Sequence, residues 1–147
     1  MAVTAVLYDH AVKKIVDGEF PDGDTFRINL YSAFTPNVTH TTLTGVHTGA
    51  TQLSSANGYV QNSKSLASPA YSTTGTNDAK FDAEDVTWTA TTGAIGPATH
   101  ALIYDDTQTG DPPLMYIAFG TGKTADPGTD FKITWATGGI VRFTYTP

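Results

Sequence analysis

Residues 99–119 decide the fold class, and they read Thr-His-Ala-Leu-Ile-Tyr-Asp-Asp-Thr-Gln-Thr-Gly-Asp-Pro-Pro-Leu-Met-Tyr-Ile-Ala-Phe. Two nearly continuous apolar runs, Thr99–Tyr104 and Leu114–Phe119, each have the length of a buried strand. The connection between them, Asp105–Pro113, is rich in Asp, Gly and Pro, which favour turns. This pattern predicts two central strands joined by a hairpin-like connection longer than a two-residue turn.

Shorter alternating segments flank this pair on both sides. Apolar and polar residues alternate in Thr25–Tyr31, Val86–Ala90 and Phe131–Trp135, which is the period of a half-buried strand. Gly138-Gly139 predicts a turn into a last strand over residues 140–145. This spacing predicts a mostly β fold, an antiparallel β-sandwich of jelly-roll or immunoglobulin-like type, with strands from about residue 25 onward.

The polar stretches between these segments are poorly patterned. Ser32–Ser55 and Ser63–Asp78 are rich in Thr, Ser, Gly and Pro, so we expect loops with at most short strands. Asn57-Gly58 predicts a tight turn that leads into a weak strand over Tyr59–Gln61.

The N-terminal residues carry the helical signal. Apolar residues recur every four positions from Val3 to Ile15, and Gly18 is a typical helix stop. We expect one short α-helix over residues 2–17, docked on a single β-sandwich domain that spans residues 1–147.

The 147-residue chain is acidic and has no cysteine. With 14 Asp and Glu against 8 Lys and Arg, its net charge is −6, which argues against nucleic-acid and anionic-membrane partners. The lack of cysteine excludes disulfides, thiolate metal sites and cysteine nucleophiles. The N-terminus does not read as a secretory signal, and no apolar run reaches the roughly 20 residues of a membrane span. We therefore expect synthesis in a cytoplasm.

One short segment resembles a phosphate-binding loop. Residues 120–124 read Gly-Thr-Gly-Lys-Thr, but the motif requires glycine at position 117, where this chain has Ile117. Asp126-Pro127-Gly128 then predicts a turn where the motif requires a helix. We interpret the segment as a hairpin loop and expect no nucleotide site.

Titratable residues give no catalytic or metal-binding pattern. The four histidines lack the spacing of a local metal site, and they are His10, His40, His47 and His100. Acidic residues cluster in loops without the twelve-residue calcium motif, at Asp22/Asp24, Asp82/Glu84/Asp85 and Asp105/Asp106/Asp111. No nucleophile elbow is present, and paired glycosidase carboxylates stay an open alternative. We expect no enzyme activity, no catalytic residue, no cofactor and no bound metal.

The aromatic residues have two possible uses. Trp88 and Trp135 are in phase with apolar neighbours, so we expect them in the core. A carbohydrate-binding platform would have to come from four residues expected in or beside loops, which are Tyr31, Phe34, Tyr59 and Tyr71.

The chain resembles a family of small structural proteins of tailed-bacteriophage virions. The resemblance covers nearly the whole chain and is carried by Tyr8-Asp9-His10, Lys13-Lys14, Asp17–Phe20, Asp24–Tyr31, Asn57-Gly58-Tyr59, Lys80–Ala90, Ala101–Asp106, Ile117–Gly120 and Phe131–Trp135. Residues 58–63 depart from the family by lacking a double glycine after Gly58-Tyr59, which affects a local turn. The resemblance carries over no catalytic residue.

The resemblance implies a non-enzymatic protein located in the virion and made in the host bacterial cytoplasm. The first interpretation is a capsid decoration or cement protein that stabilises the head. The alternatives are a tail or head–tail junction component, or a carbohydrate-binding or adhesive module displayed by the virion. The implied partners are the major capsid protein or other virion proteins, together with copies of itself in a homo-oligomer. If residues 1–18 supply the anchor, their deletion should abolish particle binding and leave a folded sandwich.

Overall fold

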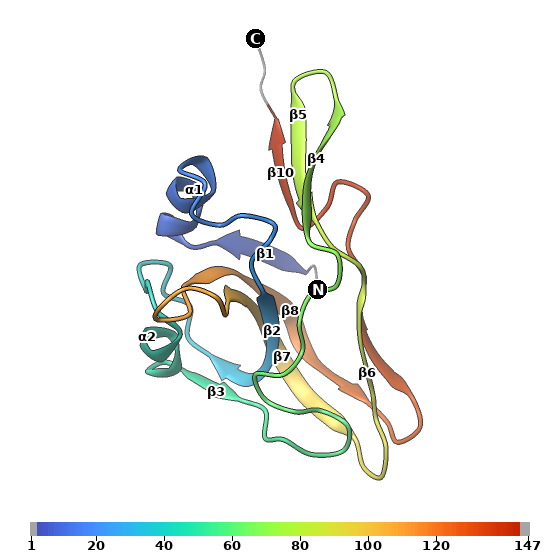
Figure 1. The fold of residues 1–147 in the computed structure, drawn as a ribbon. Coiled ribbons are helices and arrows are strands. Elements are labelled where there is room, and N and C mark those ends of the chain that lie inside the picture. The colour runs from blue at the N-terminus through green and yellow to red at the C-terminus, as the bar shows by residue number, and fades with distance from the viewer. Residues whose placement is uncertain (1–2, 145–147) are drawn as a thin grey trace.

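A computed structural model describes residues 3–144 and shows a mostly β, sandwich-like protein with 46% strand and 9% helix (Figure 1). All strand pairs are antiparallel, as the sequence predicts. In chain order the elements are β1 Thr4–Leu7, α1 Asp9–Val16, β2 Phe26–Phe34, α2 Leu43–His47, β3 Ala50–Gln52, β4 Ala70–Gly75, β5 Asp78–Asp82, β6 Val86–Thr89, β7 Ile95–Asp105, β8 Pro113–Ala125, β9 Asp130–Ile133 and β10 Val141–Thr144.

The central layer is a five-stranded sheet with the strand order β1-β8-β7-β2-β3. The two apolar runs that predicted central strands form β7 and β8, which pair side by side with Ala101 opposite Ile117. Strand β2 pairs with the other edge of β7, with Ile28 opposite Ile103. Residues 101–104 are all buried, because both faces of this sheet are covered.

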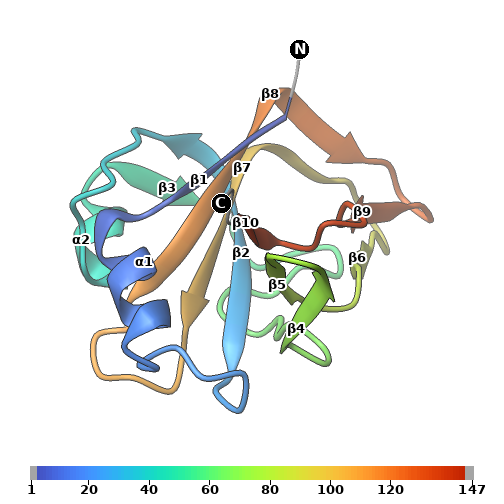
Figure 2. The ribbon, with the colours of Figure 1, turned by 90° about the horizontal axis from the view of Figure 1, so that it is seen from above.

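Figure 2 shows that the helices and the remaining strands lie on opposite sides of the five-stranded sheet. On one side, the β10-β5-β4 sheet and the β6-β9 ribbon cover the face that carries Ile28 and Ile103, and Phe26 contacts Phe81 with ring centroids 5.1 Å apart. On the other side, α1 and α2 cover the face that carries Tyr31, whose hydroxyl lies 2.9 Å from His47 Nε2. The side chains between these layers form one buried core.

The expected helix over residues 2–17 is wrong in its first half. Residues 4–7 form β1, which pairs with β8 so that Leu7 lies opposite Met115, and only Asp9–Val16 is helical. Apolar residues four apart also share a face of a strand, so the spacing alone did not separate the two structures. Gly18 ends the helical segment with φ +73°, as expected from its position.

This correction changes the expectation for a deletion of residues 1–18. The segment supplies an edge strand of the central sheet, and Tyr8 and Ala11 are 1% and 0% exposed. Removing it would uncover β8 and open the core. Residues 3–18 are therefore part of the fold and are not a removable appendage, and residues 1–2 lie outside the described range.

The polar stretches contain more structure than expected. Ser32–Ser55 holds the end of β2, helix α2 and strand β3, and Ser63–Asp78 holds β4. Thr42 caps α2, because its Oγ1 accepts a hydrogen bond of 3.1 Å from Gly45 N. Buried Asn29 holds the loop around Asn62 in place. Its Nδ2 donates to Asn62 Oδ1 over 2.6 Å, and its Oδ1 accepts from Asn62 N over 3.1 Å.

The turn at Asn57-Gly58 is confirmed, and the weak strand after it is not formed. Both residues have positive φ, 56° and 96°, and only an isolated bridge joins Ala56 to Tyr59. A Cβ on Gly58 would lie 2.1 Å from Thr89 O, so this position requires glycine for its φ and for its close packing.

Residues 120–124 are not a hairpin loop, because β8 continues through them to Ala125. The hairpin turn lies later, at residues 126–129, where Thr129 N donates to Asp126 O. The register between β7 and β8 shifts on this stretch, and Gly120 has φ +78°. Gly120 and Gly122 therefore lie in a distorted part of β8, and no helix follows them within the described residues.

Candidate functional site

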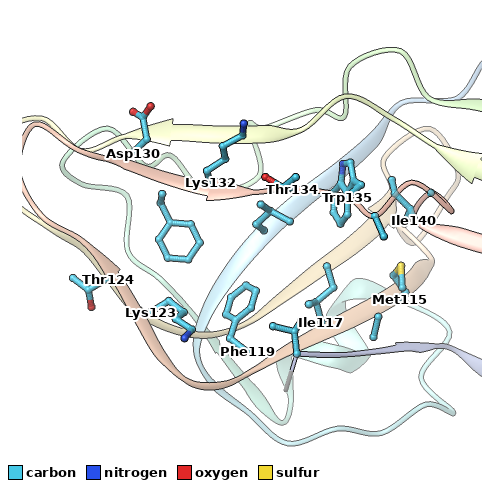
Figure 3. A pocket seen from close by; sticks show the side chains of 16 residues that line it. Met115, Ile117, Phe119, Lys123, Thr124, Asp130, Lys132, Thr134, Trp135 and Ile140 are labelled. Atoms are coloured by element: carbon cyan, nitrogen blue, oxygen red, sulfur yellow. The ribbon is translucent and has the colours of Figure 1, made fainter. Parts of the chain in front are cut away.

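The candidate site is an open groove of about 520 Å³ between β1 and β8 on one side and residues 130–140 on the other (Figure 3). We call it the β1–β8 groove. Its volume lies within the roughly 300–1,000 Å³ typical of ligand sites, and its lining is mainly apolar. The residues that line it are Val3, Ala5, Met115, Ile117, Phe119, Lys123, Thr124, Asp130, Phe131, Lys132, Ile133, Thr134, Trp135, Ala136, Gly139 and Ile140.

The floor of the groove is one face of the paired strands β1 and β8. Ala5 lies directly opposite Ile117, so both side chains point to the same side of the sheet. Alternation along each strand adds Val3 and Phe119 to this face. Ala5 is small, and Val3 is 61% exposed, so the floor widens where β1 begins.

The wall of the groove is β9 and the segment that follows it. Trp135 is held by two hydrogen bonds: its Nε1 donates to Glu84 O over 3.0 Å, and its backbone N donates to Asp85 Oδ1 over 3.1 Å. Ile140 N donates to Phe81 O over 2.9 Å, which fastens the far end of the wall to β5. The wall is therefore fixed in place by polar contacts behind it and presents apolar side chains to the groove.

Charged side chains gather at one end of the groove. Figure 3 shows Lys123, Thr124 and Asp130 at one end and Met115, Trp135 and Ile140 towards the other. Lys132 pairs with Asp85 over 3.1 Å, and this ammonium lowers the pKa of the Asp85 carboxyl. Lys123 is exposed and makes no ion pair with any residue of the range 3–144.

The four histidines do not form a site together. His10 lies on α1, His47 ends α2 and His100 lies on β7, and burial lowers the pKa of each of these three side chains. Lys14 lowers the pKa of His10 further, and both ring nitrogens of His10 are buried without a hydrogen-bond partner among the described residues. His40 contacts Asn37 in the loop before α2.

The acidic clusters are used in local structure. Asp105 is fully buried, and its Oδ1 accepts hydrogen bonds from Thr107 N and Gln108 N in the β7–β8 connection. Burial, with Asp105 beside it, raises the pKa of Asp24. Glu84 accepts a hydrogen bond of 2.8 Å from Ser68 Oγ. Within residues 3–144, no three His, Asp or Glu side chains converge as metal ligands.

The four aromatic residues proposed as a carbohydrate platform do not form one. Tyr31 and Tyr59 are 0% and 2% exposed, so both belong to the core. Phe34 is half-buried and stacks on His100 with ring centroids 4.9 Å apart. Tyr71 is half-buried on β4, where its hydroxyl donates to Phe20 O over 2.8 Å. Tyr31 and Tyr59 therefore cannot belong to an exposed aromatic platform.

The two tryptophans, both expected in the core, differ in burial. Trp88 is 4% exposed, which confirms it as a core residue. Trp135 lies beyond the end of β9, is half-buried and lines the groove. Its alternation with Phe131 and Ile133 gave the correct face, but nothing in the sequence shows that this face is only partly covered.

The lining of the groove suits the binding of an apolar partner. Its lining brings together apolar side chains, two lysines and one aspartate, and the Asp130 carboxylate is occupied by a hydrogen bond of 2.7 Å from Thr89 Oγ1. Such a surface can exclude water from an apolar partner and attract one negative charge. Among the residues described, no helix is long and apolar enough to cross a membrane.

Comparison with known proteins gives no relative: no family model, no curated protein and no solved structure matches the chain.

Proposed function

We propose that this chain is a non-enzymatic structural protein of a tailed-bacteriophage virion, where it decorates the capsid and stabilises the head. Its partners would be the major capsid protein, other virion proteins and copies of itself. The proposal starts from the sequence resemblance, which implies a virion location after synthesis in the host cytoplasm. A position at the tail or the head–tail junction is the second form of the same proposal.

The observation that supports this proposal most strongly is the β1–β8 groove. Its lining is mainly apolar: Val3 is 61% exposed, and small parts of Phe119 and Ile133, 6% and 8%, are also uncovered. A partner that fills the groove would bury more apolar surface at roughly 25 cal/mol per Å². Burial of this surface would help to hold a neighbouring protein in the groove.

The experiment is quantitative mass spectrometry of purified particles of the phage that encodes the chain. A copy number near that of the major capsid protein, or a simple large fraction of it, supports decoration of the head. A ratio of a few per cent supports the tail or the junction. Absence from the particles overturns the virion proposal.

A matched pair of variants tests whether the groove is the docking surface. Ala5→Arg places a long cation at the exposed floor, and Val60→Arg makes a similar change at an apolar residue that is 53% exposed outside the groove lining. Ala5→Arg should lower the copy number in particles, while Val60→Arg should leave it unchanged. Equal incorporation of both variants would remove the groove from the proposal.

A further inference from the structure

The outer edge of β1 is an open strand edge of four residues. One edge of β1 pairs with β8, and the other makes no backbone hydrogen bond within the described part of the chain. Its residues, Thr4-Ala5-Val6-Leu7, include no charge and no proline, and the pairing has no bulge. Charges, prolines and bulges help to protect sheet edges, because an open edge is a template for another strand.

This open edge runs beside the apolar groove. The side chains of β1 alternate, so Val3 and Ala5 point into the groove while the backbone between them faces the open edge. A strand added to this edge would continue the pleat and send every second side chain over the groove. The opposite wall, with Ile133 and Ile140, would contact those side chains.

The charge at one end of the groove indicates where an acidic group of an added strand would lie. The eight Lys and Arg side chains all lie within the described residues, and six of them pair with carboxylates. Lys64 lies over the Trp88 ring at 6.0 Å. Lys123 has neither kind of partner there, although the protein carries a net charge of −6. A negative group on the partner would therefore be placed at Lys123.

The direction of β1 places this charge at a defined end of the partner. Because β1 is antiparallel to β8, its residue Val3 lies towards Phe119 and Lys123, whereas Leu7 lies opposite Met115. An added strand that runs antiparallel to β1 would finish beside Val3, so its C-terminal end would approach Lys123.

We propose that the outer edge of β1 and the β1–β8 groove bind an extended segment of another protein by strand addition. The segment has apolar side chains at alternate positions, runs antiparallel to β1, and carries an acidic residue or a free carboxylate at its C-terminal end. That the partner is a virion protein rests on the proposed function; the site itself rests on the geometry. A single-chain amphiphile would use the groove and Lys123 but would leave the backbone edge of β1 unpaired.

The test uses the full chain and a synthetic library of acetylated octapeptides. In the library, positions 2, 4 and 6 vary among Val, Ile, Leu and Phe, positions 1, 3 and 5 among Ser, Thr and Gln, and positions 7 and 8 are acidic. Peptides retained by the immobilised chain are identified by mass spectrometry and measured by titration calorimetry. Amide NMR shifts then report where they bind. We expect saturable binding with shifts and slowed exchange at residues 4–7.

Controls separate backbone pairing from apolar contact. N-methylation of alternate backbone amides in the best peptide should weaken binding at least about tenfold, which corresponds to about 1.4 kcal/mol. Ala5→Arg and Lys123→Glu should each weaken binding, whereas Val60→Arg and Lys13→Glu should not, because Val60 and Lys13 are exposed outside the groove.

Four results would overturn the inference. One is the failure of the library to give any specific binder, and another is binding that survives both groove variants. The third is equal binding of the N-methylated peptide. The fourth is tighter binding of dodecanoate with no change at the amides of residues 4–7, which would assign the groove to an amphiphile. The assay uses no phage particle, so peptide binding with no incorporation into virions would retain the site and reject the virion proposal.

Discussion

Replacing Tyr59 by phenylalanine tests the assignment of this residue to the core. Tyr59 is 2% exposed, and its hydroxyl lies 3.0 Å from Leu30 N, from which it accepts a hydrogen bond. Gln52 Nε2 also donates to this oxygen over 3.2 Å. Leu30 is fully buried in β2, and it lies just before Tyr31, the first residue of β2 that pairs with β3. Leu53 N donates to Leu30 O over 2.9 Å, so the N–H and C=O of Leu30 point to the side where Tyr59 lies and away from β7.

The expected cost follows from the group that is left unpaired. Tyr59→Phe keeps the ring and its contact with Trp88, but it removes the acceptor of a buried backbone N–H. Leaving such a donor unsatisfied costs about 1–3 kcal/mol. For a chain of this length, each kcal/mol lowers Tm by roughly 2–4 °C, so the variant should melt several degrees lower. The loss of the hydrogen bond from Gln52 should add less to this cost, because the Gln52 side chain is only half-buried.

The assay is urea unfolding followed by circular dichroism, with calorimetry for Tm. Tyr116→Phe is the matched control, because Tyr116 is a half-buried tyrosine in β8 and its hydroxyl makes no protein hydrogen bond within residues 3–144. We expect Tyr116→Phe to change stability by less than about 0.5 kcal/mol. If the two variants lose the same amount, the hydroxyl of Tyr59 does not support β2 and the argument fails.

Three further changes test other parts of the fold. Gly58→Ala should lower the free energy of unfolding by more than about 2 kcal/mol, because its Cβ would meet Thr89 O at 2.1 Å. Gly128→Ala, at φ +80° in open space, should lower it only by the cost of backbone strain, about 1 kcal/mol. Equal losses in urea unfolding would contradict the packing argument. His10→Phe should make stability less sensitive to acid, because burial lowers the pKa of His10 below 6.5. The stability that neutral His10 contributes is complete above pH 6.5 and is lost as the pH falls through the lowered pKa. An unchanged pH profile of Tm would refute this. Deletion of residues 1–18 should unfold the chain or lower its Tm sharply in circular dichroism, and a deletion mutant with the native Tm would show that β1 is dispensable.

The sequence predicted the strands whose burial is one-sided or complete. β7, β8 and β9 follow from their apolar patterns, because the core decides which residues can occupy them. β4 had no such pattern: five of its six residues are exposed, and it is a strand because it pairs with β5. Helix α2 has five residues, too few for a helical period to be seen.

The site was harder to predict than the fold for a physical reason. Ile117 and Phe119 were expected in the core, and they are buried. They are part of a groove because open space lies between β1 and the segment around Ile140. Open space leaves no mark on the sequence of either segment. Lys123 stood out in the sequence through its glycine neighbours, but its significance comes from its position beside the groove.

The hairpin of β4 and β5 extends from one end of the molecule, as Figure 1 shows, and its turn at Thr76-Asn77 is exposed. Asn77 has φ +61°, and the hairpin's only strand partner within the described residues is β10. Exposed turns of this kind accept inserted sequence well, since the added residues disturb no packed side chain. A foreign peptide could therefore be grafted between Thr76 and Asn77 and presented to antibodies at the end of the hairpin. If many copies coat one particle, the same graft would give a dense, regularly spaced antigen array.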